Sequence, residues 1–590
     1  MSIYTSSTNF TLGFNGTYFI VGQDQLPYPL TIINSNVSSS ITVTLLFEQP
    51  INDINQYLIM GSNLININTI TSNYINPVII QNTLTNYSGL IQNSSNTDIV
   101  IQNVILISSD TASNPSLAQN AGWIVQSGCS FVRLVNCMTS LLALNNNGGL
   151  VGSNASNMSA IGCSYGGLII NGSGGIFGPY SQYITAENCT NSRDIANGSG
   201  GIFGPNCSKS TAINCSNSGD VINGSGGIFG PNCNNGATQN ASLASYCFSS
   251  GMITGNSGGI FGPNCNNFGT DSSCVANDCY SLGQIGKIGN YDNGGIFGPS
   301  ANIGSSSSSC DANRCFAIGI IFGDGFGANG GIFGGVSRNS YANQCYSSGP
   351  IGLSSGGIFG GSAYLSNATN CYSVGEIGGG GIFSGGANTC TATNCYSVGN
   401  IGVFSGGIFG YGSINSTSTN CYSIGTNNSG GGIFAGGTNT CTASNCYTTG
   451  SANIFEDGLN NNCVQTNCFI DNGWHDANAT SVLLMPNWVR LYQNVPYLLS
   501  VFVVSVNDNT GASIGSAVPG YSYFYIIPDS SIIVNGFYSS SQVQPCHPGN
   551  YNTNIYGYNI IAYPTTSSPP PIIRNPGGTI KGGFGIYQTC

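Results

Sequence analysis

The hydrophobic residues of this chain recur in short clusters and not with the long periodicity of amphipathic helices. One cluster, Gly-Gly-Ile-Phe-Gly or a close variant, occurs eleven times at steps of 24 to 36 residues. The copies begin at residues 148, 174, 200, 226, 258, 294, 330, 356, 380, 406 and 431. Such a period is typical of a solenoid, in which each repeat buries its apolar face by stacking on its neighbours.

A cysteine also recurs once per repeat, usually with Asn before it, an aromatic residue after it and Ala three residues upstream. The ladder cysteines are Cys137, Cys163, Cys189, Cys215, Cys247, Cys279, Cys315, Cys345, Cys371, Cys395, Cys421, Cys446 and Cys468. A straight strand would place Ala and Cys on opposite faces. Both are small and recurrent, so we expect both side chains to point inward, which requires a corner between them. Asn fits at that corner because it tolerates the left-handed conformation. The unit predicts one coil of an all-β fold, a right-handed parallel β-helix with Gly-Gly-Ile-Phe-Gly at its other corners.

The pattern divides the chain into three parts. Residues 1–29 are expected to cap the helix, and residues 30–498 to form it, with regular repeats over about 130–470. Residues 499–590 change character, with predicted strands at 521–527 and 532–538 and a proline run at 569–571. They predict a small C-terminal β domain or assembly arm.

Charge is scarce in this sequence. Only 5% of the residues are charged, against about a quarter in typical domains. Nine basic residues cannot form the basic patch that nucleic acid requires. No apolar run is long enough to span a membrane, and the first residues lack the pattern of a secretory signal. The polar surface must come from Asn, Ser, Thr, Tyr and the backbone.

The 24 cysteines suggest disulfides, which usually form in oxidising compartments. Cysteines with four or seven residues between them are the candidate pairs, together with the two near the C-terminus. These are Cys129/Cys137, Cys207/Cys215, Cys274/Cys279, Cys310/Cys315, Cys390/Cys395, Cys441/Cys446, Cys463/Cys468 and Cys546/Cys590. Ladder thiols in successive coils would be about 4.8 Å apart, slightly long for a disulfide, so the ladder itself is expected to be mainly packing. With two histidines in the chain, zinc is disfavoured, and neither a metal nor a cofactor is predicted.

The repeat resembles known sequences. Gly-Gly-Leu-Val-Gly at 148–152 resembles the GLUG motif of bacterial surface adhesins. The fuller unit, Gly-Gly-Ile-Phe-Gly with Asn-Cys-Tyr-Ser-x-Gly-x-Ile, is similar to repeat proteins encoded by giant viruses of amoebae. The similarity covers roughly residues 130–470. It implies a particle or surface protein, and in neither group does the repeat imply catalysis.

Parallel β-helices also include enzymes that act on polysaccharides, which need clustered acids. Glu187, Asp194 and Asp220 fall near one another in repeat register, and His475 lies beyond the regular array. A second acidic set is Asp271, Asp278 and Asp311. Neither acidic set recurs with a basic residue at a matching position, so the sequence predicts that the protein is not an enzyme.

The sequence favours a structural protein that packs with copies of itself in the outer layer, tegument or fibre of a virus particle. Other virion proteins and host-surface glycans are further candidate partners. The alternative is a surface adhesin or glycan-binding fibre, located outside the cell or on its surface. A carbohydrate-active β-helix enzyme is the third hypothesis.

Overall fold

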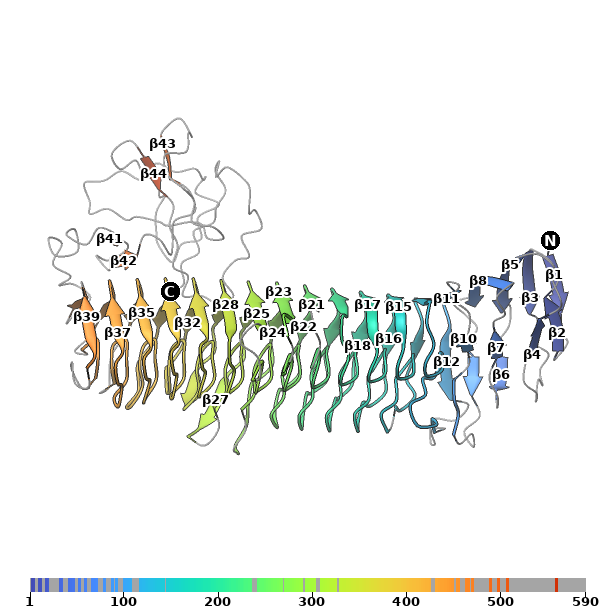
Figure 1. The fold of residues 1–590 in the computed structure, drawn as a ribbon, viewed down its shortest axis with the longest axis horizontal. Coiled ribbons are helices and arrows are strands. Elements are labelled where there is room, and N and C mark those ends of the chain that lie inside the picture. Colours follow the sequence, from blue (N-terminus) through green and yellow to red (C-terminus); the bar gives the residue numbers. More distant parts are fainter. Residues whose placement is uncertain are drawn as a thin grey trace, which may run out of the picture. The chain divides into compact units, whose positions relative to one another are not determined.

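The computed structural model describes most of residues 86–468, apart from short gaps, and elsewhere only the backbone of individual strands. Every regular element in the described residues is a β-strand. The chain divides into two units, Met1–Gly283 with Asn293–Asp311, and Gln284–Asp292 with Ala312–Cys590. Strand β25 (Ser309–Asn313) crosses the boundary between them. In each unit, strands that recur once per coil stack in parallel, which confirms the predicted all-β parallel β-helix (Figure 1).

The first unit has two long parallel sheets. Its first sheet contains β1 (Ser2–Thr5), β3 (Gly16–Ile20), β5 (Ile41–Phe47), β8 (Ile65–Ser72), β11 (Ile99–Gln102), β13 (Val132–Val135), β15 (Ser156–Ile161), β17 (Gln182–Glu187), β19 (Thr211–Ile213), β21 (Ala241–Ser245) and β23 (Ser273–Asn277). Its second sheet contains β6 (Ile51–Ile54), β9 (Val78–Ile80), β12 (Ile105–Ser108), β14 (Met138–Thr139), β16 (Ser164–Tyr165), β18 (Thr190–Asn191), β20 (Ser216–Asn217), β22 (Phe248–Ser249) and β24 (Tyr280–Ser281). The smaller parallel pairs are β2 (Asn9–Leu12) with β4 (Thr31–Asn34), and β7 (Leu58–Met60) with β10 (Ile91–Asn93).

The second unit repeats this plan. Its first sheet contains β28 (Ser340–Asn343), β31 (Asn367–Thr369), β33 (Thr391–Thr393), β35 (Thr417–Thr419), β37 (Thr442–Ser444) and β39 (Val464–Thr466). Its second sheet contains β26 (Phe316–Ala317), β29 (Tyr346–Ser347), β32 (Tyr372–Val374), β34 (Tyr396–Val398), β36 (Tyr422–Ile424), β38 (Tyr447–Thr449) and β40 (Phe469–Asp471). The pair β27 (Ile321–Asp324) and β30 (Ile351–Leu353) is also parallel.

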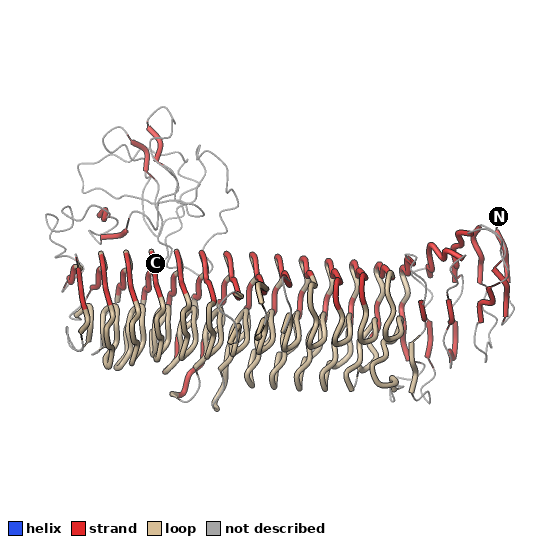
Figure 2. Tube along the Cα trace, in the orientation of Figure 1, coloured by secondary structure: helices blue, strands red, loops and turns tan. Residues whose placement is uncertain are grey.

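The Gly-Gly-Ile-Phe-Gly motifs form the third side of each coil, which contains bends and single bridges and no long strand (Figure 2). Gly200 and Phe203 bridge to the same positions of the next coil, Gly226 and Phe229. Ile202 and Phe203 are adjacent, yet both are fully buried because the backbone bends between the two bridges. The phenylalanine rings stack from coil to coil, with centroids 4.5 to 5.6 Å apart along the series 177–297 and 4.7 to 4.8 Å apart along the series 333–455.

The corners explain two further features of the repeat. Asn188, directly before Cys189, has φ of 54°, and the equivalent Asn394 has the same value, so the corner predicted between Ala and Cys is confirmed. Successive corner asparagines bond to each other, for example Asn394 Nδ2 to Asn370 Oδ1 at 3.1 Å. At the motif corner, a Cβ on Gly201 would lie 2.0 Å from the Gly227 carbonyl oxygen. The second motif position therefore has no room for a side chain.

At both ends of the β-helix, the structure describes the pairing of individual strands. Within residues 1–29, the predicted cap, β1 pairs in parallel with β3, and β3 pairs in parallel with β5, so both strands belong to the first sheet. After β40, described pairing is antiparallel: β41 (Trp488–Arg490) with β42 (Pro496–Leu498), and β43 (Val506–Asp508) with β44 (Tyr558–Ile560). The predicted strands at 521–527 and 532–538 and the proline run lie outside the described residues. The described part of the chain contains no helix with the length and apolar content to cross a membrane.

Candidate functional site

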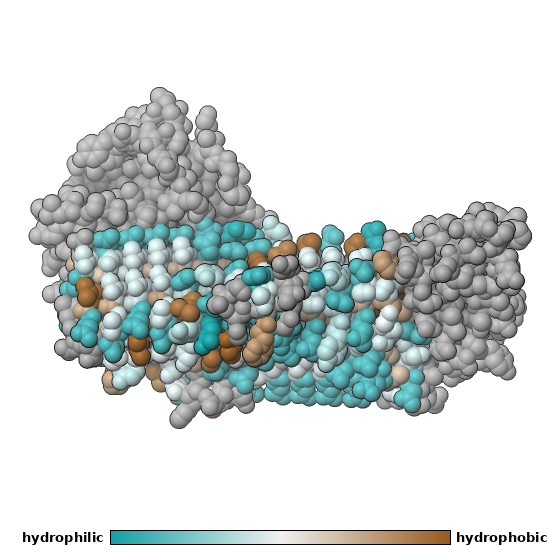
Figure 3. Space-filling model, viewed as in Figure 1, coloured by the Kyte–Doolittle hydropathy of each residue, from teal (hydrophilic) through white to brown (hydrophobic). Residues whose placement is uncertain are grey.

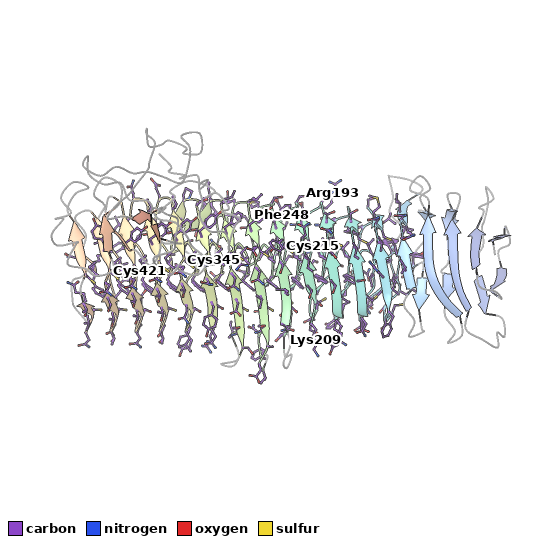
Figure 4. The ribbon with its side chains drawn as sticks, turned by 90° about the horizontal axis from the view of Figure 1, so that it is seen from above. Arg193, Lys209, Cys215, Phe248, Cys345 and Cys421 are labelled. Atoms are coloured by element: carbon purple, nitrogen blue, oxygen red, sulfur yellow. The ribbon has the colours of Figure 1, made fainter. Side chains whose placement is uncertain are left out.

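The ladder cysteines line the interior of the coils. In Figure 4 the labelled Cys215, Cys345 and Cys421 lie within the stack, whereas Arg193 and Lys209 point away from it. Each ladder thiol has backbone acceptors: Cys215 Sγ donates to the carbonyl oxygen of Ile213 at 3.4 Å and to that of Ala186, in the preceding coil, at 3.5 Å. Because Ala recurs three residues before Cys, this bond repeats along the ladder, and the thiols act as buried packing groups with satisfied hydrogen bonds.

Despite their burial, Cys371 and Cys421 have a lowered pKa because of hydrogen bonds with neighbouring ladder thiols. For other interior thiols, burial suppresses ionisation. It raises the pKa of Cys390 to about 12 and that of Cys441 to about 11, because the interior disfavours a thiolate. The pKa values of Cys345 and Cys395 are raised as well, first by burial and then by adjacent thiols of the ladder. A protonated, buried thiol is a poor nucleophile and a poor metal ligand.

The structure forms no disulfide among the 22 cysteines that it describes, so the intracoil disulfides suggested by the spacing are not formed in it. The candidates among these cysteines are Cys129, Cys137, Cys207, Cys215, Cys274, Cys279, Cys310, Cys315, Cys390, Cys395, Cys441, Cys446, Cys463 and Cys468. The reason is visible at Cys390 and Cys395, which lie at opposite ends of β33, so that a whole strand and the Asn394 corner separate them. Cys546 and Cys590 lie outside the described residues.

One close pair of thiols was not among the pairs suggested by the spacing. Sγ of Cys265 lies 3.5 Å from Sγ of Cys310, and both residues are fully buried in the first unit. They are 45 residues apart in the chain. The signal in the sequence is a cysteine directly after Gly-Pro-Asn, a position that also contains Cys207 and Cys233.

The acidic residues of the first candidate set bind backbone amides. Asp194 Oδ1 accepts the Asp220 N–H at 3.0 Å, and Asp220 Oδ1 accepts the Met252 N–H at 2.8 Å, so each caps an amide of the next coil. Glu187 lies at the end of β17, before the corner. The carboxylates of Asp194 and Asp220 therefore connect successive coils.

The second acidic set is spread over two corners and one strand of the first unit. Asp271 and Asp278 have φ of 51° and 54° at two corners separated by β23. Asp311 Oδ2 accepts a bond from Ser309 Oγ at 3.0 Å, and burial raises the pKa of the Asp311 carboxyl. Within the described residues, no group of three or more His, Cys, Asp or Glu could hold a metal ion. His475 lies outside them.

Several aromatic side chains are exposed on the coils. Phe404 and Tyr411 are 64% and 55% exposed and meet edge to face, with ring centroids 6.1 Å apart. In the first unit, Lys209 Nζ lies over the ring of Tyr183, 4.5 Å from its centroid. These residues occur in single coils and lie outside the repeat pattern, so the repeat carries no signal for them.

The described coils define the chain as a parallel β-helix. No family model and no curated protein matches the sequence. Solved structures that match include the catalytic domain of a GH87 α-1,3-glucanase, wild-type or D1069A, with nigerose, at 9% identity and TM-scores of 0.20 and 0.21. The match covers 73% of this chain, which spans 64% of the length of those domains. Another is ORF18 of Geobacillus virus E2, at 10% identity and a TM-score of 0.12 over 74% of this chain and 55% of the other.

These matches correct one prediction. The matched glucanase structures are catalytic domains, which contradicts the expectation that the protein is not an enzyme, and that expectation is withdrawn. With TM-scores near 0.2, the matches assign no activity to this chain either.

Proposed function

We propose that the protein is a structural component of a virus particle and that it packs side by side with copies of itself in the outer layer, tegument or fibre. The virion setting rests on the resemblance of the repeat to giant-virus repeat proteins. The side-by-side packing rests on the coils of the second unit between Arg338 and Glu456, which combine a regular backbone with an almost complete lack of charge.

The observation that supports packing is an uncharged face formed by the first sheet of the second unit. Between Arg338 and Glu456, the sequence contains one charged residue, Glu376. Two rows of half-buried side chains alternate with inward Ala or Ser along this sheet. The rows are Thr391, Thr417 and Thr442, and Thr369, Thr393, Thr419 and Ser444. Figure 3 shows the polar and near-neutral rows along one side of the coils.

Such a face favours association for two reasons. A surface with little net charge lacks the repulsion that keeps soluble proteins apart. Rows of short hydroxyl side chains lose little conformational entropy on contact, compared with the long side chains of Lys, Arg or Glu. A second copy can therefore pack against the threonine rows at low cost.

The test places charge on the proposed contact. The full-length chain should form multimers or ordered arrays at high concentration, as seen by light scattering and electron microscopy. The double substitution Thr393→Lys with Thr419→Lys should reduce them, with partial recovery at high salt because salt screens the charges. The matched control, Ser354→Lys with Asn400→Lys, adds the same charge at two exposed residues outside this sheet. A full-length chain that stays monomeric at all concentrations would refute the proposal.

A glycan-binding fibre is a second candidate, favoured by the exposed Phe404 and Tyr411 pair. Exposed aromatic rings with an apolar face offer a surface for sugar rings, and such rings are otherwise costly to leave in water. Glycan-array binding that is lost on Phe404→Ala and kept on Tyr246→Ala, which is also exposed, would support this function. No binding by the full-length chain would exclude it.

A further inference from the structure

Two columns of small residues meet at the corner that leads into the first sheet of the first unit. The motif column follows Gly-Pro-Asn or Gly-Pro-Ser, and the entry column lies at the start of the first-sheet strands. The motif column contains Cys207, Cys233, Cys265 and Ala301. The entry column contains Ser242, Cys274 and Cys310. All of these residues are buried.

The entry-column thiols reach back to the preceding coil. Cys274 Sγ lies 3.7 Å from the carbonyl oxygen of Cys233, and Cys310 Sγ lies 3.7 Å from that of Cys265. The Sγ atoms of Cys310 and Cys265 are themselves 3.5 Å apart. Two thiols in contact need only a small side-chain rotation to reach the bond length of a disulfide, about 2.0 Å.

The neighbours of Cys310 favour one partner, Cys265. In the same turn of chain, the motif-column residue is Ala301, which carries no sulfur. Cys315, the partner suggested by the spacing, is separated from Cys310 by most of β25 and by the corner at Arg314, whose φ is 53°. Cys265 is in direct contact. Cys274 also interacts with Cys233, Cys265 and Cys310. When Cys265 pairs with Cys310, Cys233 remains as a partner for Cys274.

We propose that Cys265 and Cys310 form a disulfide between adjacent coils of the first unit. The oxidant is a small disulfide such as oxidised glutathione. During folding, before burial protects the two thiols, the thiolate of one cysteine attacks it, which forms a mixed disulfide and releases one reduced glutathione. The second cysteine then attacks the cysteine sulfur of the mixed disulfide, which forms the Cys265–Cys310 bond and releases the second. The cysteines lose two electrons in total, and each thiol proton ends on a released glutathione.

The bond has a structural purpose in this place. The coils that contain these cysteines are the long ones, because the steps from the motif at 226 to those at 258, 294 and 330 are 32, 36 and 36 residues. Longer loops cost more entropy to close. A covalent link between coils offsets that cost where the insertions occur.

The experiment uses the full-length chain refolded from the reduced state in a glutathione redox buffer, then quenched in acid, alkylated and digested with trypsin and chymotrypsin. Cleavage at Lys287, Arg314 and the phenylalanines leaves Cys265 on residues 262–268 and Cys310 on residues 298–314, each without another cysteine. We expect a peptide map, made without reductant, in which these two peptides are joined. They should separate when the sample is reduced. A second sample, the folded chain treated with diamide, gives an independent reading if refolding is poor.

The controls distinguish this pair from non-specific oxidation. Cys310→Ser should abolish the joined peptide, whereas Cys207→Ser should leave it, because Cys207 lies in the same column but has Ser242 at the entry position of the next coil. Circular dichroism verifies the β fold of each variant. If folded protein shows both cysteines alkylated in both samples, or Cys310 joined to Cys315, the proposal is wrong.

Discussion

The motif glycines offer a sharp test of the coil structure through the substitution Gly201→Ala. A Cβ there would lie 2.0 Å from the Gly227 carbonyl oxygen and 2.8 Å from Ile195 Cδ1. Ordinary contact of a Cβ begins at 3.4 Å, so the oxygen is about 1.4 Å too close. The oxygen belongs to the backbone of the next coil and cannot rotate away.

Relief of this clash requires the two coils to separate at the motif. Such separation stretches the bonds from Gly201 N–H to Gly226 O and from Ile202 N–H to Ile228 O, both 3.1 Å long. Two buried amides that lose their partners cost about 1–3 kcal/mol each, so we expect a loss of about 2–6 kcal/mol. The matched control is Gly166→Ala, because a Cβ there would lie 3.6 Å from its nearest neighbour, in ordinary contact.

The assay is urea denaturation followed by circular dichroism, with hydrogen exchange to locate the change. Gly201→Ala should lower the midpoint clearly and speed exchange at the amides of residues 201 and 202, whereas Gly166→Ala should change both little. Equal midpoints for the two variants would refute the steric argument, because the native packing would then have room for the methyl group.

Three further predictions concern the interior, the corners and the thiols. Phe383→Ala removes a buried ring between stacked neighbours at 4.7 and 4.8 Å and should cost about 3–5 kcal/mol in thermal or urea denaturation, whereas the exposed Tyr411→Ala should be nearly neutral. Asn420→Ala should cost about 2 kcal/mol, because it places Ala at a φ of 55° and breaks bonds of 3.1 Å to two neighbouring asparagines; Asn420→Gly should recover the backbone part. Burial raises the pKa of Cys390 from 9.0 to about 12 in the folded protein. The stability that the protonated thiol contributes is therefore complete below pH 9 and is lost as the pH rises towards 12, by about 1.4 kcal/mol per pH unit. Cys390→Ala should flatten the decline of the urea midpoint at alkaline pH, and an unchanged decline would contradict this prediction.

The fold could be predicted because the repeat constrains each corner separately. Asn188, before Cys189, has a left-handed backbone conformation, and Gly201 occupies a position with no room for a side chain. Each of these residues indicates a corner by itself, whatever residues surround it. The recurrence of both at one period then implies stacking. Where the chain lacks the repeat, as in residues 1–29, the sequence carries no comparable signal, and the parallel pairing of β1 with β3 and of β3 with β5 was not predicted.

The site residues were harder to predict because their contacts join different coils. The spacing of Cys310 and Cys315 is visible in the sequence, but the contact of Cys310 with Cys265 depends on which residues stack across two insertions of unequal length. Asp194 and Asp220 were grouped correctly by repeat register, yet their role as acceptors for amides of the next coil depends on side-chain direction. Neither the contacts between coils nor the direction of a side chain can be read from a motif in the sequence.

The constancy of the bridges across repeats of different length has a consequence for how this protein can evolve. Gly200 bridges to Gly226 over 26 residues, and Gly258 bridges to Gly294 over 36 residues, so the extra residues leave the coil contacts as they were. Duplication or loss of one repeat in the gene therefore yields a chain that can still fold, with its stack longer or shorter by one strand spacing, about 4.8 Å. Length in this protein is inherited in discrete steps, and unequal recombination between near-identical repeats is enough to adjust it.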